Sequence, residues 1–196
     1  MSQGNSAMRI VGGRFGGRPL RGPTSNATRP TSDRLREALF NVLAHAYGDA
    51  ADGARVLDLF AGTGALGLEA LSRGAKLAVF VEEAAEPRGL IRANVEALGL
   101  GGVTRIFRRD ATRLGTAFAS DAFDLVFCDP PYGRGLAEQA LAGVRDGGWL
   151  APGALVLVEE AVEAAFAPPE GFEELERRRY DTTEVIFLRA PGGGAA

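Results

Sequence analysis

Short apolar runs alternate along most of this chain with segments whose apolar residues recur at helical spacing. Runs rich in Val, Leu and Phe that are bounded by Gly, Asp or Pro predict buried strands, and the intervening periodicity predicts helices. The predicted strands cover residues 55–59, 77–82, 103–108, 123–128, 155–160, 172–180 and 184–189, and the predicted helices cover residues 65–73, 87–98, 112–118 and 136–144. This alternation predicts an α/β fold with a mostly parallel, seven-stranded sheet whose last two strands form an antiparallel hairpin.

The N-terminal part of the chain follows a different pattern. Residues 8–11 and 18–21 predict a small hairpin around Gly16 and Gly17. A helix should then begin near Arg29 and Pro30, with Thr31 or Ser32 as its N-cap. The predicted buried face of this helix consists of Leu35, Leu39, Val42, Leu43 and Ala46. We therefore expect a basic N-terminal extension over residues 1–48, a core domain over residues 53–190 and a flexible tail over residues 191–196.

Composition argues against several classes of protein. Apolar residues make up 46% of the chain, enough for a sizeable core, and no apolar run approaches the ~18–20 residues of a membrane helix. Residues 1–7 lack the apolar core of a signal peptide, so we expect a cytoplasmic protein with no membrane partner. The single cysteine, Cys128, and the single histidine, His45, argue against a disulfide, a zinc site or a His-based triad, so no metal is expected. His45 should lie on the surface, and Cys128 should close its strand as an apolar residue.

Charge is distributed unevenly along the chain. The first 36 residues contain seven arginines and one acid, whereas the rest of the chain contains 15 basic and 24 acidic residues. An arginine-dense segment punctuated by Gly and Pro is typical of an arm that binds nucleic-acid phosphates, although a solvated tail is the alternative. The candidate RNA-binding residues are Arg9, Arg14, Arg18, Arg21, Arg29 and Arg34, together with Arg134 further along the chain.

A glycine-rich turn joins the predicted strand 55–59 to the helix that follows it. Gly62, Gly64 and Gly67 match the pattern G-x-G-x-x-G, which predicts that the backbone closely approaches a nucleotide-like ligand. The Asp58 carboxylate, near the strand end, could meet an ammonium group. S-adenosylmethionine carries such a group, so Asp58 argues against NAD as the ligand. The alternative role of Asp58 is to cap the turn.

The next two strands are also followed by acids. Glu82 or Glu83, at the end of the strand 77–82, should accept hydrogen bonds from ribose hydroxyls. Asp110 could accept from an adenine amino group or cap the short helix after it, and the two roles can coexist. Because parallel strands carry their carboxyl ends at one edge of the sheet, these acids should border a single cofactor site.

The most informative segment is Asp129-Pro130-Pro131-Tyr132, which directly follows the predicted strand 123–128. Two prolines fix the backbone and remove two N–H donors, which leaves nearby carbonyls as acceptors beside the Asp129 carboxylate. The Tyr132 ring offers a flat face on which a base can stack. Acceptors beside a stacking surface suit a planar exocyclic amine, as on adenine or guanine, while a rigid turn without this function is the alternative.

From these motifs, the chain resembles the RsmD family of bacterial 16S rRNA (guanine(966)-N2)-methyltransferases over residues 8–189. The resemblance rests on residues 9–13 with Arg18, 29–41, 57–67 and 129–132. The Arg-Pro-Thr sequence that begins the second stretch is the most specific, because the other motifs recur across amino-methyltransferases. The resemblance implies the class I S-adenosylmethionine-dependent methyltransferase fold, which is Rossmann-like.

The resemblance also implies roles for individual residues. Those that would bind the cofactor are Asp58, the loop residues Phe60, Gly62 and Gly64, the ribose ligand Glu82, and the adenine ligand Asp110 with Ala111 beside it. The catalytic residues, which would hold the guanine, are Asp129, Pro130 through its carbonyl, and Tyr132. The family often has a second acid two residues after the ribose acid, whereas this chain has Ala84, so Glu82 or Glu83 alone would make the ribose contact.

These expectations describe an enzyme that methylates the N2 amine of a specific guanine in 16S rRNA, within an assembling small ribosomal subunit. An adenine-N6 DNA methyltransferase and a protein glutamine methyltransferase are alternatives, because both use the same acceptor chemistry. A non-catalytic RNA-binding module fits less well, because the acceptor motif is intact. An NAD enzyme also fits less well, because the chain lacks a second catalytic constellation.

Overall fold

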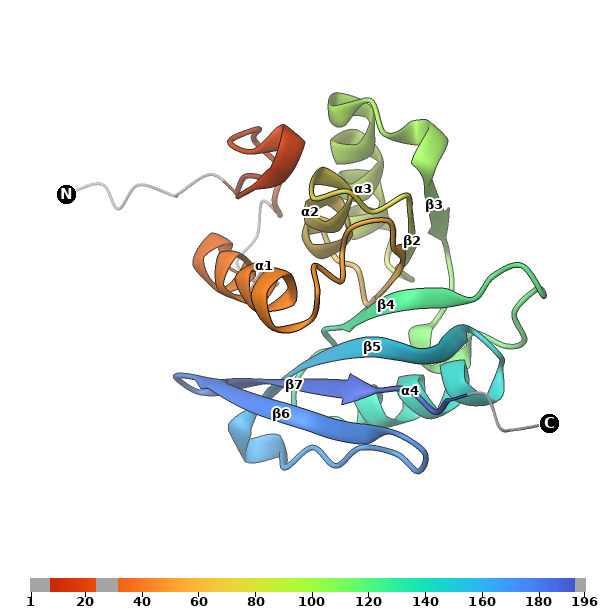
Figure 1. Cartoon of the computed structure of the whole chain (residues 1–196). Coiled ribbons are helices and arrows are strands. Elements are labelled where there is room, and N and C mark those ends of the chain that lie inside the picture. Colours follow the sequence, from red (N-terminus) through yellow and green to blue (C-terminus); the bar gives the residue numbers. More distant parts are fainter. Residues whose placement is uncertain (1–7, 24–31, 193–196) are drawn as a thin grey trace.

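Seven strands form a single sheet with the order β3-β2-β1-β4-β5-β7-β6 in the computed structural model, which describes residues 8–23 and 32–192. Strands β1 to β5 are parallel to one another, and β7 runs antiparallel to both β5 and β6. The predicted parallel sheet with a closing antiparallel hairpin is therefore confirmed (Figure 1). The strands are β1 (Arg55–Leu59), β2 (Leu77–Val81), β3 (Thr104–Phe107), β4 (Phe123–Cys128), β5 (Leu150–Ala161), β6 (Glu173–Tyr180) and β7 (Thr183–Arg189).

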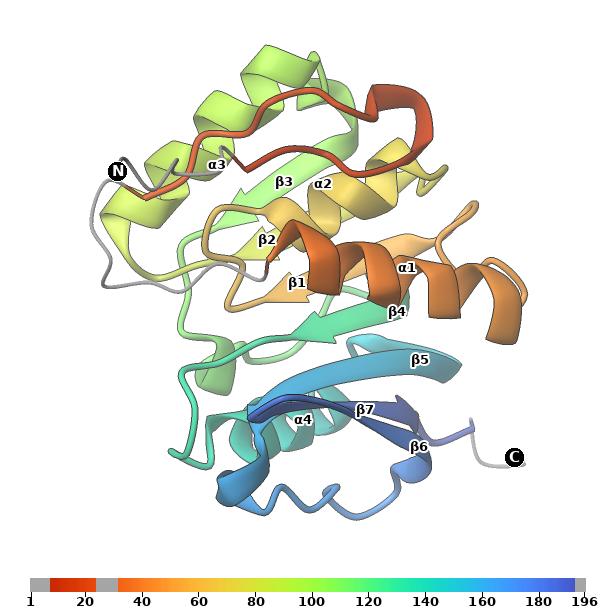
Figure 2. The same cartoon turned by 90° about the vertical axis from the view of Figure 1, so that its left-hand side faces the viewer.

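Helices cover both faces of this sheet, and each face has its own apolar core (Figure 2). Three helices pack on one face, and their buried residues, such as Leu39, Leu68 and Ile91, join one core. The fourth packs on the opposite face, where Leu141 and the buried Trp149 join the other core. The helices are α1 (Asp33–Ala46), α2 (Ala65–Ser72), α3 (Ala85–Leu98) and α4 (Leu136–Asp146). No helix within the described ranges is long and apolar enough to span a membrane.

Two predicted elements differ clearly in extent from the structure, whereas the bounds of the other predicted strands and of the other helices after β1 agree within two residues. The helix predicted over residues 112–118 is only a 3-10 turn, Ala111–Arg113, because Gly115 adopts a positive φ of 76° and the chain then turns toward the end of α4. Strand β5 begins at Leu150 rather than at residue 155. The intervening Pro152 and Gly153 fall where the register against β4 shifts, and such an irregularity tolerates both residues inside a strand.

The predicted N-terminal hairpin is present and lies beside α2 and α3 (Figure 2). Ile10 N–H donates to the Arg18 carbonyl and Leu20 N–H to the Met8 carbonyl, while a 3-10 turn, Gly13–Phe15, closes the hairpin. Helix α1 begins after its N-cap Ser32, whose hydroxyl accepts from Leu35 N–H at 3.1 Å.

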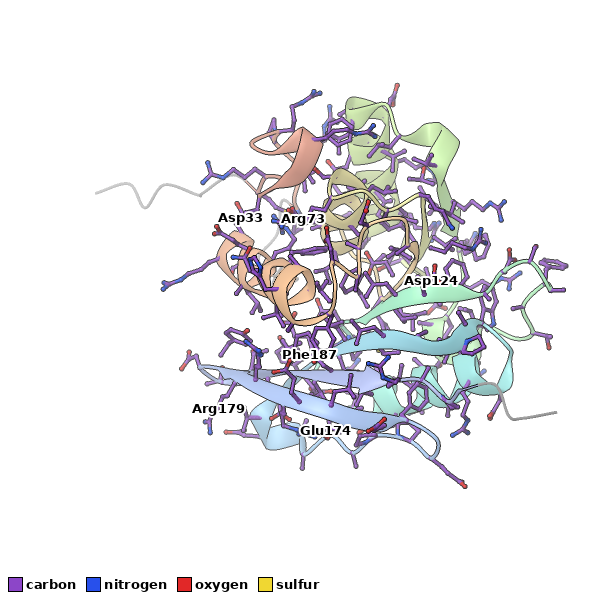
Figure 3. All side chains as sticks on the ribbon, in the orientation of Figure 1. Asp33, Arg73, Asp124, Glu174, Arg179 and Phe187 are labelled. Carbon is purple, nitrogen blue, oxygen red and sulfur yellow. The ribbon has the colours of Figure 1, made fainter. Side chains whose placement is uncertain are left out.

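The buried face of α1 differs from the predicted one. Arg36 and Phe40 are buried together with Leu39, Val42 and Leu43, whereas Ala46 is exposed and Leu35 is only partly buried. Tyr47, just past the helix, stacks on Phe187 of β7 with ring centroids 5.3 Å apart, so the end of α1 reaches the antiparallel part of the sheet. Figure 3 labels Phe187 there. His45 is exposed and Cys128 is buried at the end of β4, as predicted.

Candidate cofactor and acceptor site

A pocket of about 480 Å³ opens where the carboxyl ends of β1, β2, β3 and β4 meet. Its lining therefore combines segments that are far apart in the sequence, as expected for the ligand edge of a parallel sheet. The lining residues are Phe60, Val81, Glu82, Glu83, Ala84, Arg109, Asp110, Ala111, Thr112, Pro131 and Leu136. The strand-end acids and one proline of the Asp129–Tyr132 segment thus border the same space.

The glycine-rich turn after β1 holds the pocket wall in an unusual backbone conformation. Phe60 has a φ of 58°, which is uncommon for a bulky residue, and Gly62 and Gly64 have φ values of 58° and 79°. At Gly67 an added Cβ would lie 2.5 Å from the Phe80 ring, so only glycine lets α2 pack this closely on β2. The three glycines of the motif therefore serve backbone shape and close packing.

Asp58 acts on this turn from inside the protein. Its side chain is 1% exposed, and its Oδ2 accepts from Gly67 N–H at 3.0 Å. Burial raises the pKa of Asp58 to about 8, and the neighbouring Glu82 carboxylate adds to the rise. Of the two expected roles, the turn contact is therefore formed, and contact with a ligand ammonium stays a prediction.

Glu82 is fixed at the pocket wall by two backbone donors. Its Oε2 accepts from Gly62 N–H and its Oε1 from Ala84 N–H, both at 2.9 Å. Each carboxylate oxygen has further acceptor capacity, so this group can also accept from ligand hydroxyls. Glu83 borders the pocket as well, and its carbonyl accepts from Arg88 Nη1.

Asp110 occupies the expected N-cap position and faces the same pocket. Its Oδ1 accepts from Thr112 N–H at 2.8 Å and from the Thr112 hydroxyl at 2.7 Å. These hydrogen bonds lower the pKa of Asp110, which keeps it ionised as an acceptor. Ala111, which follows it, is buried against the pocket.

The Asp129–Tyr132 segment leaves β4 at the pocket rim. Asp129 is partly buried, Pro130 is buried, and Pro131 lines the pocket. The Tyr132 side chain is 38% exposed, and its hydroxyl donates to Glu159 Oε1 and lies 3.4 Å from the Thr183 hydroxyl. Burial, together with the Glu159 carboxylate, raises the pKa of Tyr132, so its hydroxyl remains a donor.

Sequence reasoning missed the two acids at the end of β5. Glu160 Oε1 accepts from Gly133 N–H at 2.9 Å, and Glu159 binds Tyr132, so consecutive residues of β5 hold the segment after β4. Both acids are buried. The available signal was their position directly after the apolar run 154–158, at the same sheet edge as Asp58 and Glu82.

The candidate RNA-binding arginines lie in several environments. Arg9, Arg14, Arg18, Arg21, Arg34 and Arg134 are exposed, whereas Arg29 lies outside the described residues. Arg36, part of the same basic stretch, is 0% exposed and pairs with Asp33 at 2.7 Å and Glu69 at 3.3 Å. Because the Arg36 guanidinium is buried and paired, the N-terminal segment presents less positive charge to solvent than its sequence indicates.

Across the described residues no group of three or more His, Cys, Asp or Glu is arranged to hold a metal ion.

Comparisons with known proteins cover almost the whole chain. Residues 8–189 match the family described as "Conserved hypothetical protein 95". The Escherichia coli protein named Ribosomal RNA small subunit methyltransferase D is 44% identical over 161 residues, which cover 82% of this chain and 78% of the relative. The Thermus thermophilus protein named tRNA (guanine(6)-N2)-methyltransferase is 38% identical over 121 residues, or 57% of this chain and 35% of the relative. A solved Escherichia coli structure, described as the putative methyltransferase yhhF, has a TM-score of 0.80 and 34% identity, covering 95% of this chain and 99% of that one.

Proposed function

Because the chain belongs to the RsmD family and has the class I methyltransferase fold, we propose that it methylates the exocyclic N2 amine of one guanine, of the guanine-966 type, in 16S rRNA. Family membership supports the coarser statement directly: the chain is a ribosomal RNA methyltransferase that uses S-adenosylmethionine. The guanine and its N2 atom are the proposal. They are supported by the acceptor motif and by a relative whose name specifies guanine N2.

The pocket residues fit S-adenosylmethionine. A volume of about 480 Å³ suits a nucleoside with an amino-acid arm. Glu82, or Glu83 beside it, would accept from the ribose hydroxyls, and Asp110 with Ala111 would bind the adenine. Phe60, Gly62 and Gly64 would shape the wall, and Asp58 would hold the turn or reach the ammonium group. The cofactor supplies a methyl group on a positively charged sulfur, which an amine can attack.

The observation that carries the proposal is that Pro131 borders the same pocket as Glu82 and Asp110. Residues 129–133, here called the acceptor segment, would therefore lie against the proposed cofactor site. Asp129 and the Pro130 carbonyl would accept hydrogen bonds from the target amine while the base stacks on Tyr132. These contacts orient the amine and favour a lone pair directed at the methyl group. Positioning and fixed dipoles would supply most of the acceleration, with no need for a strong base.

The proposed context of the RNA substrate is an assembling small subunit. Exposed arginines on the N-terminal hairpin and Arg134 beside the acceptor segment would contact phosphates. Guanines that are unpaired or can be extruded present their amine to such a site. Adenine in DNA and glutamine in a protein carry amino groups that the same acceptors could hold, so both remain outcomes of the test.

The test replaces the target guanine by inosine, which lacks the exocyclic amine but keeps the other base edges. Methyl transfer to the guanine RNA should yield N2-methylguanosine after nucleoside digestion, and the inosine RNA should accept no methyl group. A parallel assay on naked RNA and on partly assembled subunits identifies the preferred form. Formation of N6-methyladenosine, or activity only on DNA or protein, would overturn the proposed substrate and leave the fold unaffected.

A further inference from the structure

The end of β5 is bound to the acceptor segment at two points. Val158 of β5 pairs with Cys128 of β4, so the residues that follow each of them emerge side by side at the same sheet edge. The next residues of β5 are Glu159 and Glu160, and those after β4 begin with Asp129. The two acids therefore reach the acceptor segment directly across the sheet.

The two acids bind different parts of that segment. Leu157 and Val158 belong to the cores on opposite faces of the sheet, so by alternation the next two side chains also leave opposite faces. Glu159 accepts from the Tyr132 hydroxyl, while Glu160 accepts from Gly133 N–H at 2.9 Å and from its neighbour Ala161 N–H at 2.8 Å. Glu160 thus holds the backbone, and Glu159 holds the far end of the ring.

We propose that Glu159 is a positioning residue that fixes the plane of the Tyr132 ring before the target base arrives. This inference rests on the proposed function, in which a base stacks on that ring. Stacking by itself needs only an aromatic face, which phenylalanine would also supply. The Tyr132 hydroxyl therefore has a role other than stacking. Its contacts with Glu159 of β5 and Thr183 of β7 indicate that this role is to hold the ring in place.

The physical gain is preorganisation. Tyr132 is 38% exposed, so without its hydroxyl contacts the ring could turn about its side-chain bonds. Glu159 is only 8% exposed, so water competes weakly for its carboxylate, and a hydrogen bond to a charged acceptor is stronger than a neutral one. The Thr183 hydroxyl is a second contact of the Tyr132 hydroxyl, 3.4 Å from it. A ring already fixed in place loses less freedom when the base binds, and it holds the amine closer to the attack geometry.

A double-mutant cycle tests this role. Tyr132→Phe removes the hydroxyl and keeps the stacking face, and Glu159→Ala removes the acceptor. Each should lower the single-turnover methyl-transfer rate at saturating RNA by about tenfold, the size expected for one charge-assisted hydrogen bond. The combined variant should also be about tenfold slower, because both changes remove the same hydrogen bond. The dissociation constant for the cofactor should not change in any of the three.

Conservative and matched variants separate positioning from general structural damage. Glu159→Gln retains an oxygen acceptor for the Tyr132 hydroxyl. Its methyl-transfer rate should therefore be close to that of the unmodified protein and well above that of Glu159→Ala. Glu163→Gln changes an exposed acid just after β5 and should behave as the unmodified protein. Should Glu159→Ala fold poorly in a thermal melt, Tyr132→Phe and Glu159→Gln still test the role, because both are nearly isosteric: Tyr132→Phe should be about tenfold slower, and Glu159→Gln should stay near the full rate.

The outcomes distinguish this inference from the proposed function. Tyr132→Ala should lose far more activity than Tyr132→Phe, and an unchanged rate in Tyr132→Ala would contradict the stacking role itself. If Tyr132→Ala is slow but Tyr132→Phe reacts at the full rate, the ring is needed and its tether to Glu159 is not. Effects of Tyr132→Phe and Glu159→Ala that multiply to about a hundredfold would likewise overturn the positioning role.

Discussion

At the scale of single residues, backbone N–H groups hold the acids of the site in place. Glu82 accepts from Gly62 and Ala84, Asp110 from Thr112, and Glu160 from Gly133. Such hydrogen bonds fix a carboxylate without neutralising its charge. Each of these acids can therefore present a fixed acceptor at the strand end while it also shapes the loop that follows.

Glu82→Ala should weaken cofactor binding by about 1.5–3 kcal/mol, the contribution of a hydrogen bond to a charged group. The variant can no longer accept from the ribose, and it also releases Gly62 N–H in the glycine-rich turn. Isothermal titration calorimetry with the cofactor measures the change. Glu83→Ala is the matched control on the same pocket wall and should bind almost normally. If Glu83→Ala weakened cofactor binding more than Glu82→Ala did, the ribose contact would belong to Glu83.

Asp58 should make stability depend on pH in a defined direction. Its folded-state pKa of about 8 lies above the ~3.9 of an unfolded Asp, so between these values the folded state binds the extra proton. The contribution of Asp58 to stability is therefore present at low pH and is lost as the pH rises toward about 8. In Asp58→Asn this loss disappears, while the amide oxygen can still accept from Gly67 N–H.

Urea unfolding at pH 5 and pH 8 measures the effect of Asp58→Asn. Relative to the unmodified protein, the variant should gain at least about 1 kcal/mol between these pH values, because one pKa unit corresponds to about 1.4 kcal/mol. Asp52→Asn, at an exposed position, is the control and should show no such gain. A stability difference for Asp58→Asn that is the same at both pH values would contradict the titration.

At the scale of elements, a buried acid of α2 joins the N-terminal hairpin to the core. Glu69 is 0% exposed and accepts from Val11 N–H at 2.9 Å and Gly12 N–H at 2.8 Å. Its two oxygens also pair with Arg36 of α1 and with Arg73 at the end of α2. In Figure 3, Arg73 lies between α1 and the hairpin. This one carboxylate therefore connects the hairpin, α1 and α2.

Asn94 of α3 makes the second anchor of the hairpin. Its side chain exchanges hydrogen bonds with the backbone of Arg21 and also donates to the Thr63 carbonyl at 3.1 Å. Thr63 lies within the glycine-rich turn, and its hydroxyl also lies 3.6 Å from the Met8 sulfur of the hairpin. The hairpin therefore contacts the proposed cofactor loop both directly, through Met8, and by way of Asn94. For residues 8–23, this docking argues against the alternative of a solvated tail.

Glu69→Ala should destabilise the protein by about 3 kcal/mol, at the low end of the cost of breaking a buried ion pair. The low end applies because Arg36 keeps its ion pair with Asp33. Urea unfolding gives the free energy, and hydrogen exchange at Ile10 N–H, which bonds across the hairpin, should become faster. Glu37→Ala, at an exposed position of α1, is the control. A change below about 1 kcal/mol would mean that Glu69 does not anchor the hairpin.

At the scale of the whole molecule, the arginines of β6 and those of the N-terminal hairpin differ in how many acids surround them. On the edge strand β6, Arg177 pairs with Glu174 at 2.9 Å and Arg178 with Glu176 at 2.7 Å. The hairpin instead carries exposed arginines among few acids, and of these Arg9 lies 3.7 Å from Asp33 of α1. A net charge of −3 for the chain conceals this division. RNA should therefore approach the hairpin side of the protein and the acceptor segment, and not the β6 edge.

Replacing Arg9, Arg14, Arg18 and Arg21 together by Gln should weaken RNA binding across sequences. The log–log dependence of affinity on salt should flatten by somewhat less than one unit for each phosphate that the protein no longer neutralises. Filter binding at several salt concentrations gives this slope, and cofactor binding should be retained. The paired arginines Arg177 and Arg178, replaced in the same way, form the control. Equal slopes for the hairpin variant and the unmodified protein would exclude the hairpin from the RNA interface.

The sequence by itself determined the elements whose causes are local. Strands β1 and β4 have the predicted bounds, because an apolar run between turn residues is enough to define a strand that is buried on both faces. The N-cap role of Ser32 and that of Asp110 depend on residues two or three positions away. The candidate pocket acids were also predictable, because parallel strands must end at one edge.

Only the tertiary structure decided the contacts between segments far apart in the chain. Glu159 meets Tyr132 because β5 pairs with β4, and 27 residues separate the two side chains in the sequence. Arg36 is buried because Glu69, 33 residues away, supplies its counter-charge, which no periodicity of α1 encodes. Buried polar groups need partners wherever the fold provides them. The pattern along the chain therefore predicts which segments are buried, and the packed sheet and helices determine which charges meet.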